Sequence, residues 1–197
     1  MSCELIALHL IQRAEKEGID DMTQMKLHKL LYYVQGHYLA MYGKKAFSAP
    51  IKAYNHGPVV SSFYGVLKKH VERLKPVTCA VLCTALGLSG TVSLDSDLLN
   101  ITDKVFDELG SKTALELRQM THKESPWLAH QIASSPDRAD GEEITEVELM
   151  DYFSPIATEM YVASVVGDAQ AITESELLAI PEEIQTAEDF LSWMKAC

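Results

Sequence analysis

Residues 22–42 form the longest stretch of regularly spaced apolar side chains in this sequence, and the spacing predicts a long amphipathic helix. The side chains recur every three or four positions, which places them on one helical face. They are Met25, Leu27, Leu30, Leu31, Val34, Tyr38, Leu39 and Tyr42. Asp20, Asp21 and Thr23 supply side chains that can cap the first turn, and Gly43 can end the helix in a left-handed conformation.

The segments on either side of this helix predict two further helices and a short extended crossing. A first helix is expected over residues 3–16, stopped near Gly18. Residues 50–54 resemble extended chain or an edge strand, because Pro50 cannot donate to a ladder. Asn55, His56 and Gly57 have turn chemistry. Pro58 fits the first position of a third helix, expected over residues 59–70.

The middle of the chain is ambiguous at first and then clearly helical. Residues 74–94 fit two short strands, or a helix followed by a hairpin, and periodicity does not choose between them. Residues 98–109 predict a helix that Gly110 ends. The next helix starts after either Ser111 or a Thr113–Glu116 capping box, and it ends near His122.

The pattern weakens toward the end of the chain. Ser125 and Pro126 are expected to open a helix that includes Trp127 and continues to Ile132. Residues 134–137 and 139–141 have loop composition. A Thr145–Glu148 capping box precedes a further helix.

These elements predict a mostly α fold: a compact helical domain with a short extended or β-hairpin element between helices. The expected domain covers residues 1–153, and residues 154–197 form an acidic C-terminal extension that is partly helical. The apolar fraction of 47% is enough for one sizeable core in 197 residues.

The net charge of −11 is unevenly distributed along the chain. Residues 1–135 carry 15 Lys and Arg against 13 Asp and Glu, whereas residues 136–197 carry 2 against 15. So acidic a segment repels nucleic acid. It suits either a basic partner surface or plain solvation, and the charge pattern leaves both open.

Composition also indicates the compartment. No apolar run approaches the roughly 18 residues that a membrane helix needs. The N-terminus has an early acid and no basic region, unlike a signal peptide. The four cysteines have no framework spacing. We therefore expect a cytoplasmic protein with reduced thiols and no membrane partner.

Three motifs in order resemble one known family. They are K-L-x-K-L-L-Y-Y-x-Q-G from Lys26, I-K-A-Y-N-H-G-P-V-V-x-x-x-Y from Ile51 and T-H-x-x-x-P-W from Thr121. Together they resemble the Panacea domain, the SocA-like, phage-associated family also called GepA-like, over about residues 5–153. His28 departs from the pattern, which commonly has Gln there.

The resemblance implies a function. Similar proteins are antitoxins, or adapters that hold a toxin. We therefore expect a protein-binding module that neutralises a cognate toxin, either by steric block or by delivery to a protease, with an AAA+ protease as a candidate second partner. No catalytic residue and no cofactor are expected.

Eight residues are candidates for contact with the partner, because aromatic side chains are frequent anchors at interfaces and because the motifs converge on them. They are Tyr32, Tyr33, His56, Gly57, Pro58, Tyr64, His122 and Trp127. The alternative is structural. The tyrosines would then join helices in the core, the glycine–proline segment would be a turn, and the tryptophan would fill a helix corner.

Other function classes have weaker support in the sequence. Cys79 and Cys83 lack a second ligand pair at zinc spacing, so no metal is expected. No phosphate loop or hydrolase motif is present. An enzyme with an unrecognised pocket remains an alternative. A DNA-binding regulator is another, with Arg13, Lys26, Lys29, Lys68 and Lys69 as a possible basic face.

Overall fold

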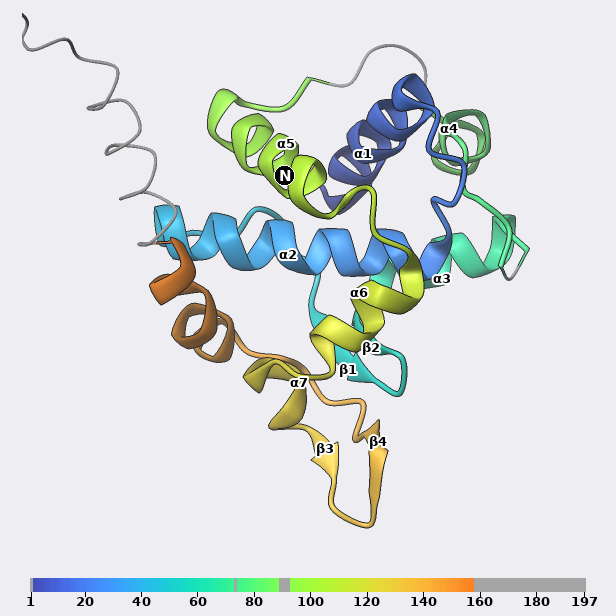
Figure 1. Ribbon diagram of the computed structural model, residues 1–197. Coiled ribbons are helices and arrows are strands. Elements are labelled where there is room, and N and C mark those ends of the chain that lie inside the picture. The colour runs from blue at the N-terminus through green and yellow to red at the C-terminus, as the bar shows by residue number, and fades with distance from the viewer. Residues whose placement is uncertain (1, 73, 89–92, 158–197) are drawn as a thin grey trace, which may run out of the picture. The chain divides into compact units, whose positions relative to one another are not determined.

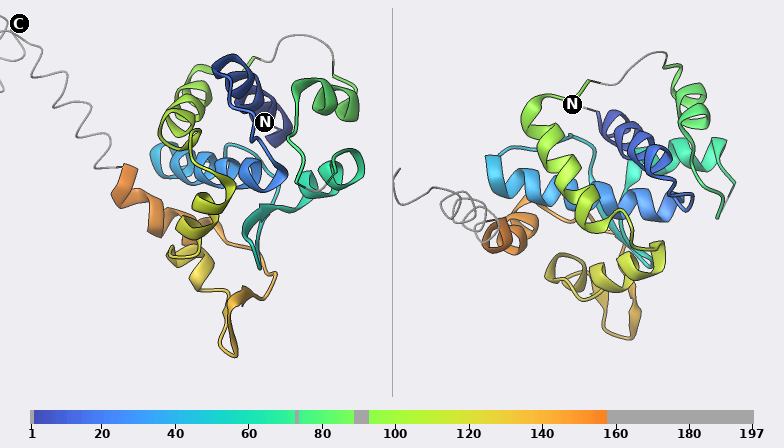
Figure 2. Two further views of the ribbon diagram at one scale, coloured as in Figure 1. Left: turned by 45° about the vertical axis from the view of Figure 1, so that its right-hand side comes forward. Right: turned by 45° about the horizontal axis from the view of Figure 1, so that its top comes forward.

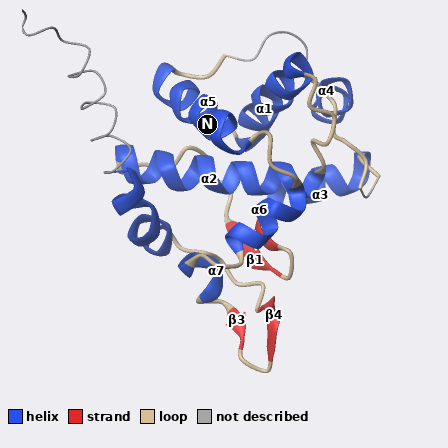
Figure 3. Ribbon diagram, viewed as in Figure 1, coloured by secondary structure: helices blue, strands red, loops and turns tan. Residues whose placement is uncertain are grey.

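The computed structural model describes residues 2–72, 74–88 and 93–157, all within one unit that spans Met1–Thr158. Most of the predicted acidic extension, residues 158–197, lies outside the described residues. The fold is mostly α with two small antiparallel hairpins, which confirms the predicted class (Figures 1 and 3).

The helices and strands follow one another along the chain with short connections. The helices are α1 (Cys3–Glu17), α2 (Gln24–Tyr42), α3 (Ser61–His70), α4 (Cys79–Leu86), α5 (Ser96–Leu109), α6 (Ala114–Thr121) and α7 (Ser125–Leu128). Residues 146–157 are also helical. The strands are β1 (Ile51–Tyr54), β2 (Gly57–Val60), β3 (Gln131–Ile132) and β4 (Ser135–Ala139).

Helix α2 is the centre of this unit. Helices α1 and α5 lie along one side of it, and α6 and the β1–β2 hairpin lie along the other (Figures 1 and 2). Every residue from Lys26 to Leu39 is buried. The helix is therefore buried all round and not on one face alone, as the spacing of its apolar residues predicted, because polar side chains such as Lys29 and Gln35 are buried as well.

The ends of the first two helices confirm the predicted capping residues. Gly18 has φ +73° and its N–H bonds to the carbonyls of Ala14 and Glu15, so it closes α1. The Thr23 side chain accepts from the Lys26 N–H at the start of α2, and Gly43 at φ +63° ends that helix.

The prediction for Pro58 was wrong. Residues 57–60 form β2 instead of the first turn of a helix, and α3 starts at Ser61. They pair with β1 in the register Ile51↔Val60 to Tyr54↔Gly57. The fixed φ of proline suits a strand edge as well as a first helical turn, and Val59 and Val60 favour the strand.

The expectation of an edge strand at residues 50–54 also needs correction, because β1 has partners on both sides. The Ala53 N–H donates to the Glu142 carbonyl at 2.9 Å, and the Gly141 N–H donates to the Ala53 carbonyl at 2.9 Å. The Ile144 N–H reaches the Ile51 carbonyl at 2.9 Å. Residues 141–144 therefore continue the sheet beside β1.

The second half of the chain resolves the remaining alternatives. Residues 79–86 are helical, with Thr78 as N-cap, so the two-strand alternative for residues 74–94 is wrong there. Capping boxes form at Thr113–Glu116 and at Thr145–Glu148, as predicted. However, α7 stops at Leu128, and Ile132 belongs to the β3–β4 hairpin. Strand β4 at residues 135–139 overlaps both segments predicted as loop, 134–137 and 139–141. The sequence of this hairpin lacks the alternation of apolar and polar residues that would predict strands.

Candidate functional site

The β1–β2 hairpin is fastened to α2 by a buried lysine. Lys29 has no exposed surface, and its Nζ donates to the Pro58 carbonyl at 2.9 Å. Burial, and secondarily the positive charge of Arg118, lower the Lys29 pKa to about 7, while the charge of Glu124 opposes that shift. Two of the five residues in the possible basic face, Lys26 and Lys29, have fully buried side chains and so are not available at the surface to contact DNA.

Gly57 allows this close approach. Its φ is +92°, and a Cβ placed there would lie 2.7 Å from Thr121 Oγ1 and 2.8 Å from Lys29 Cε. Residues with a side chain rarely adopt this backbone conformation, and Thr121 and Lys29 already occupy the space that a Cβ would need. The turn predicted at residues 55–57 thus requires glycine at this position for two independent reasons.

A buried carboxylate from the start of α7 packs against the middle of α2, where Tyr32 and Tyr33 lie. Glu124 accepts hydrogen bonds from the hydroxyls of Tyr32, at 2.8 Å, and Tyr33, at 2.6 Å. Tyr152, from the helix at residues 146–157, donates a third. Burial raises the Glu124 pKa, and the three hydroxyl donors oppose that rise. Burial beside the same carboxylate raises the pKa values of Tyr32 and Tyr33, so all three hydroxyls stay protonated as donors.

Trp127 packs against the end of β1, next to the turn of the hairpin. It is fully buried and donates from Nε1 to the Tyr54 carbonyl at 2.9 Å. The imidazole of His122 stacks on the indole with ring centroids 3.8 Å apart and planes at 17°. Helices α6 and α7 therefore hold the end of β1 through the third sequence motif.

Two tyrosines lie on the surface of this anchored hairpin and of α3. Tyr54 is 38% exposed and Tyr64 is 41% exposed, and their ring centroids are 6.4 Å apart. His28 lies behind Tyr64, with ring centroids 6.0 Å apart. Burial lowers the His28 pKa to about 3, so its ring is neutral near pH 7.

The eight predicted residues separate into three groups by exposure. Tyr32, Tyr33, Gly57, Pro58 and Trp127 are buried, His122 is half-buried, and His56 and Tyr64 are exposed. The structure brings all three sequence motifs together around one hairpin. Contact of the eight residues with a partner stays a prediction.

Four residues of this region were not among the eight candidates: Lys29, Tyr54, Glu124 and Tyr152. Lys29 was considered only as part of a possible basic face. Lys29 occupies a position inside an apolar helical run, which is a signal of a buried, hydrogen-bonded cation. Glu124 has no such signal, because a single acid in a loop before Ser125 and Pro126 resembles an ordinary helix start.

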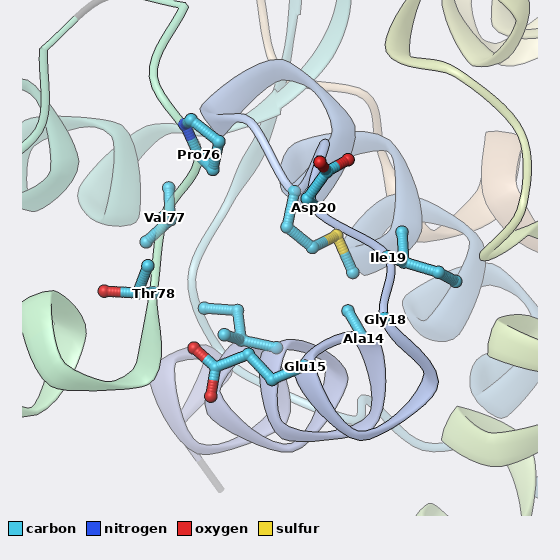
Figure 4. Close-up of a pocket in the computed structure, with 10 residues that line it drawn as sticks. Ala14, Glu15, Gly18, Ile19, Asp20, Pro76, Val77 and Thr78 are labelled. Carbon is cyan, nitrogen blue, oxygen red and sulfur yellow. The ribbon is translucent and has the colours of Figure 1, made fainter.

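The pocket in Figure 4 lies elsewhere and involves none of the predicted residues. It has a volume of about 360 Å³ and lies between the end of α1 and residues 76–78. Its walls are mainly apolar, from Ile11, Ala14, Met22 and Val77. The Glu15 carboxylate at its rim accepts the Cys79 N–H at 2.9 Å, so the acid there serves to start α4.

Residues 2–72, 74–88 and 93–157 contain neither a candidate metal site nor a candidate membrane span. No group of three or more His, Cys, Asp or Glu side chains in these ranges could hold a metal ion. No helix in the same ranges has the length and apolar character to cross a membrane.

Comparison with known proteins adds one match. The family model described as antitoxin SocA-like, Panacea domain, matches residues 27–128, which is more than half of the chain. The matched range includes most of α2, both strands of the first hairpin, Glu124 and Trp127. No curated protein and no solved structure gave a significant match.

Proposed function

The chain belongs to the antitoxin SocA-like Panacea family, and from this premise we propose that it neutralises a cognate toxin by binding that protein. The observation that carries the proposal is the family match across residues 27–128. The matched range includes Lys29, Pro58, Glu124 and Trp127, whose buried polar contacts hold the hairpin against α2 and α7.

We place the toxin on the exposed side of the hairpin and α3. His56, Tyr64 and the neighbouring Tyr54 are exposed there, and two of them are aromatic. Tyrosine supplies a large contact area at low conformational cost, which suits an interface anchor. The buried candidates would contribute indirectly: Trp127 donates to the Tyr54 carbonyl, and Pro58 is held on the paired strand by Lys29.

Two modes of neutralisation fit this proposal: steric block of the toxin, and delivery of the toxin to an AAA+ protease. They differ in a measurable quantity. Steric block leaves the toxin's half-life unchanged or longer in cells that contain the antitoxin, whereas delivery shortens it in a manner that depends on the protease.

The test of the proposal is co-expression with the adjacent open reading frame. We expect the neighbouring gene to arrest growth when expressed alone, and this chain to restore growth and to co-purify with the gene product. A harmless neighbour, together with no specific partner in a pull-down from the native host, would contradict the proposal. An activity lost on changing His56 while partner binding persists would support an enzyme instead.

A further inference from the structure

The sheet around β1 has two outer edges of unlike character. The outer edge of β2 is closed. Pro58 has no N–H, its carbonyl accepts from Lys29, and residues 57–60 are all buried. Another chain cannot add a strand on this side without displacing α2.

The opposite edge, residues 141–144, has different surroundings. Gly141, Glu142 and Ile144 direct their backbone bonds toward β1. Glu143 lies directly opposite Lys52 between those bonds, so its own N–H and C=O point away from β1. Within the described part of the chain these two groups make no hydrogen bond, and the residue is exposed.

The exposed tyrosines lie beside this open edge. The pairing of Lys52 with Glu143 places Tyr54 next to Gly141. A Cβ built on Gly141 would lie 3.8 Å from Tyr54 Cε1, so the ring extends over the glycine. Tyr64 then continues the aromatic surface across to α3.

The charges at this edge favour a cation. Asp140, Glu142 and Glu143 are exposed in sequence around Gly141, and neither glutamate forms an ion pair within the described ranges. Lys52 opposes Glu143, Lys68 follows Tyr64 by one helical turn, and Arg138 precedes Asp140 by two residues. The charge nearest to the open N–H and C=O is the carboxylate of Glu143 itself. The neutral His28 adds no positive charge behind the rings.

We propose that the edge at residues 141–144 binds an extended, basic segment of the partner protein. The segment's backbone pairs with the N–H and C=O of Glu143, in the manner of strand addition. One of its arginine or lysine side chains lies over the Tyr54–Tyr64 pair, whose ring faces attract cations. This inference rests on the proposed toxin-binding function and gives the chemistry of the bound segment.

The test uses two nine-residue peptides as probes, one of alternating arginine and threonine and one of alternating glutamate and threonine. We expect the arginine peptide to bind the full chain, with the Glu143 amide shifting and exchanging more slowly in NMR spectra. Tyr54→Leu should weaken binding about 5-fold, while Tyr54→Phe should keep it within about 2-fold, since phenylalanine retains the ring face.

A charge control separates this site from general attraction to an acidic protein. Glu143→Gln and Glu108→Gln remove the same charge, and Glu108 is exposed on α5 far along the chain from the edge. We expect only Glu143→Gln to weaken binding by more than about 2-fold. Equal effects of the two variants, equal effects of Tyr54→Leu and Tyr54→Phe, or binding of the glutamate peptide would overturn the inference.

The proposed function has a separate readout. If co-expression with the adjacent gene restores growth and Tyr54→Leu restores it equally well, the antitoxin function stands and the edge proposal fails. If the wild-type chain restores no growth, the antitoxin proposal fails whatever the peptides do.

Discussion

The ammonium group of Lys29 donates a 2.9 Å hydrogen bond to the carbonyl of Pro58, deep between α2 and the first hairpin. This contact joins two of the three sequence motifs in a single bond. It also buries a titratable amine away from water, so the contribution of Lys29 to the free energy of unfolding depends on pH.

The first prediction concerns that pH dependence. The folded pKa of Lys29 is lowered to about 7 from 10.5, so the unfolded chain binds an additional proton between these two values. Stability from this group therefore rises as pH increases from about 7 to 10.5. The free energy of unfolding of wild type minus that of Lys29→Met should therefore increase as the pH rises through this window.

Lys69→Met is the matched control, because Lys69 is exposed on α3. Its difference from wild type should stay flat over the same pH range. A flat profile for Lys29→Met as well would show that the ammonium group is not desolvated as the structure indicates.

The second prediction is that Gly57→Ala lowers the free energy of unfolding by about 2–4 kcal/mol, through the positive φ and the contact with Thr121 Oγ1. Gly65→Ala is the comparison, since a Cβ there meets nothing within 4 Å and the residue lies inside α3. It should be neutral or stabilising by up to about 1 kcal/mol. Chemical denaturation of both variants checks the pair, and equal effects would contradict the account.

The third prediction concerns the carboxylate that three tyrosines share. Glu124→Gln keeps the shape but replaces an oxygen acceptor with a donor amide, facing hydroxyls that already donate. We expect a loss of about 1–3 kcal/mol in the free energy of unfolding. The exposed Glu108→Gln should change it by less than about 0.5 kcal/mol. A Glu124→Gln variant as stable as wild type would mean that the hydroxyl contacts contribute no net stability.

The fourth prediction concerns the packing of the helix at residues 146–157 against α2. A Cβ on Gly36 would lie 2.3 Å from the ring of Phe153, so Gly36→Ala should displace that ring and cost about 1–3 kcal/mol. Phe153→Leu shortens the clashing group. The double variant should therefore be more stable than the two single losses predict by addition, and a strictly additive result would contradict this contact.

The sequence was sufficient for elements whose signal is local. The ends of α1 and α2 follow from Gly18, Thr23 and Gly43, and the two capping boxes follow from the residues that form them. Pro58 was assigned to a helix because its preference for a first helical turn is local, whereas its pairing with Ala53 is decided by the neighbouring strand.

Burial of polar groups was harder to predict. Lys29 and Glu124 are far apart in the sequence and have charges that usually favour solvent. Their burial depends on which helix crosses which hairpin, and that is a tertiary property. Tyr54 was missed as an exposed aromatic for the same reason: its ring lies over Gly141, which joins the sheet from a distant part of the chain.

The central claim is that the exposed side of the hairpin and α3 binds a toxin, and growth rescue by a surface variant tests it most directly. The neighbouring gene is expressed together with wild type, with His56→Ala/Tyr64→Ala, or with Lys16→Ala as a surface control on α1, and the thermal stability of each chain is measured. The account predicts that wild type and the lysine control restore growth, while His56→Ala/Tyr64→Ala folds normally and fails to restore it. Full rescue by that folded variant would contradict the account.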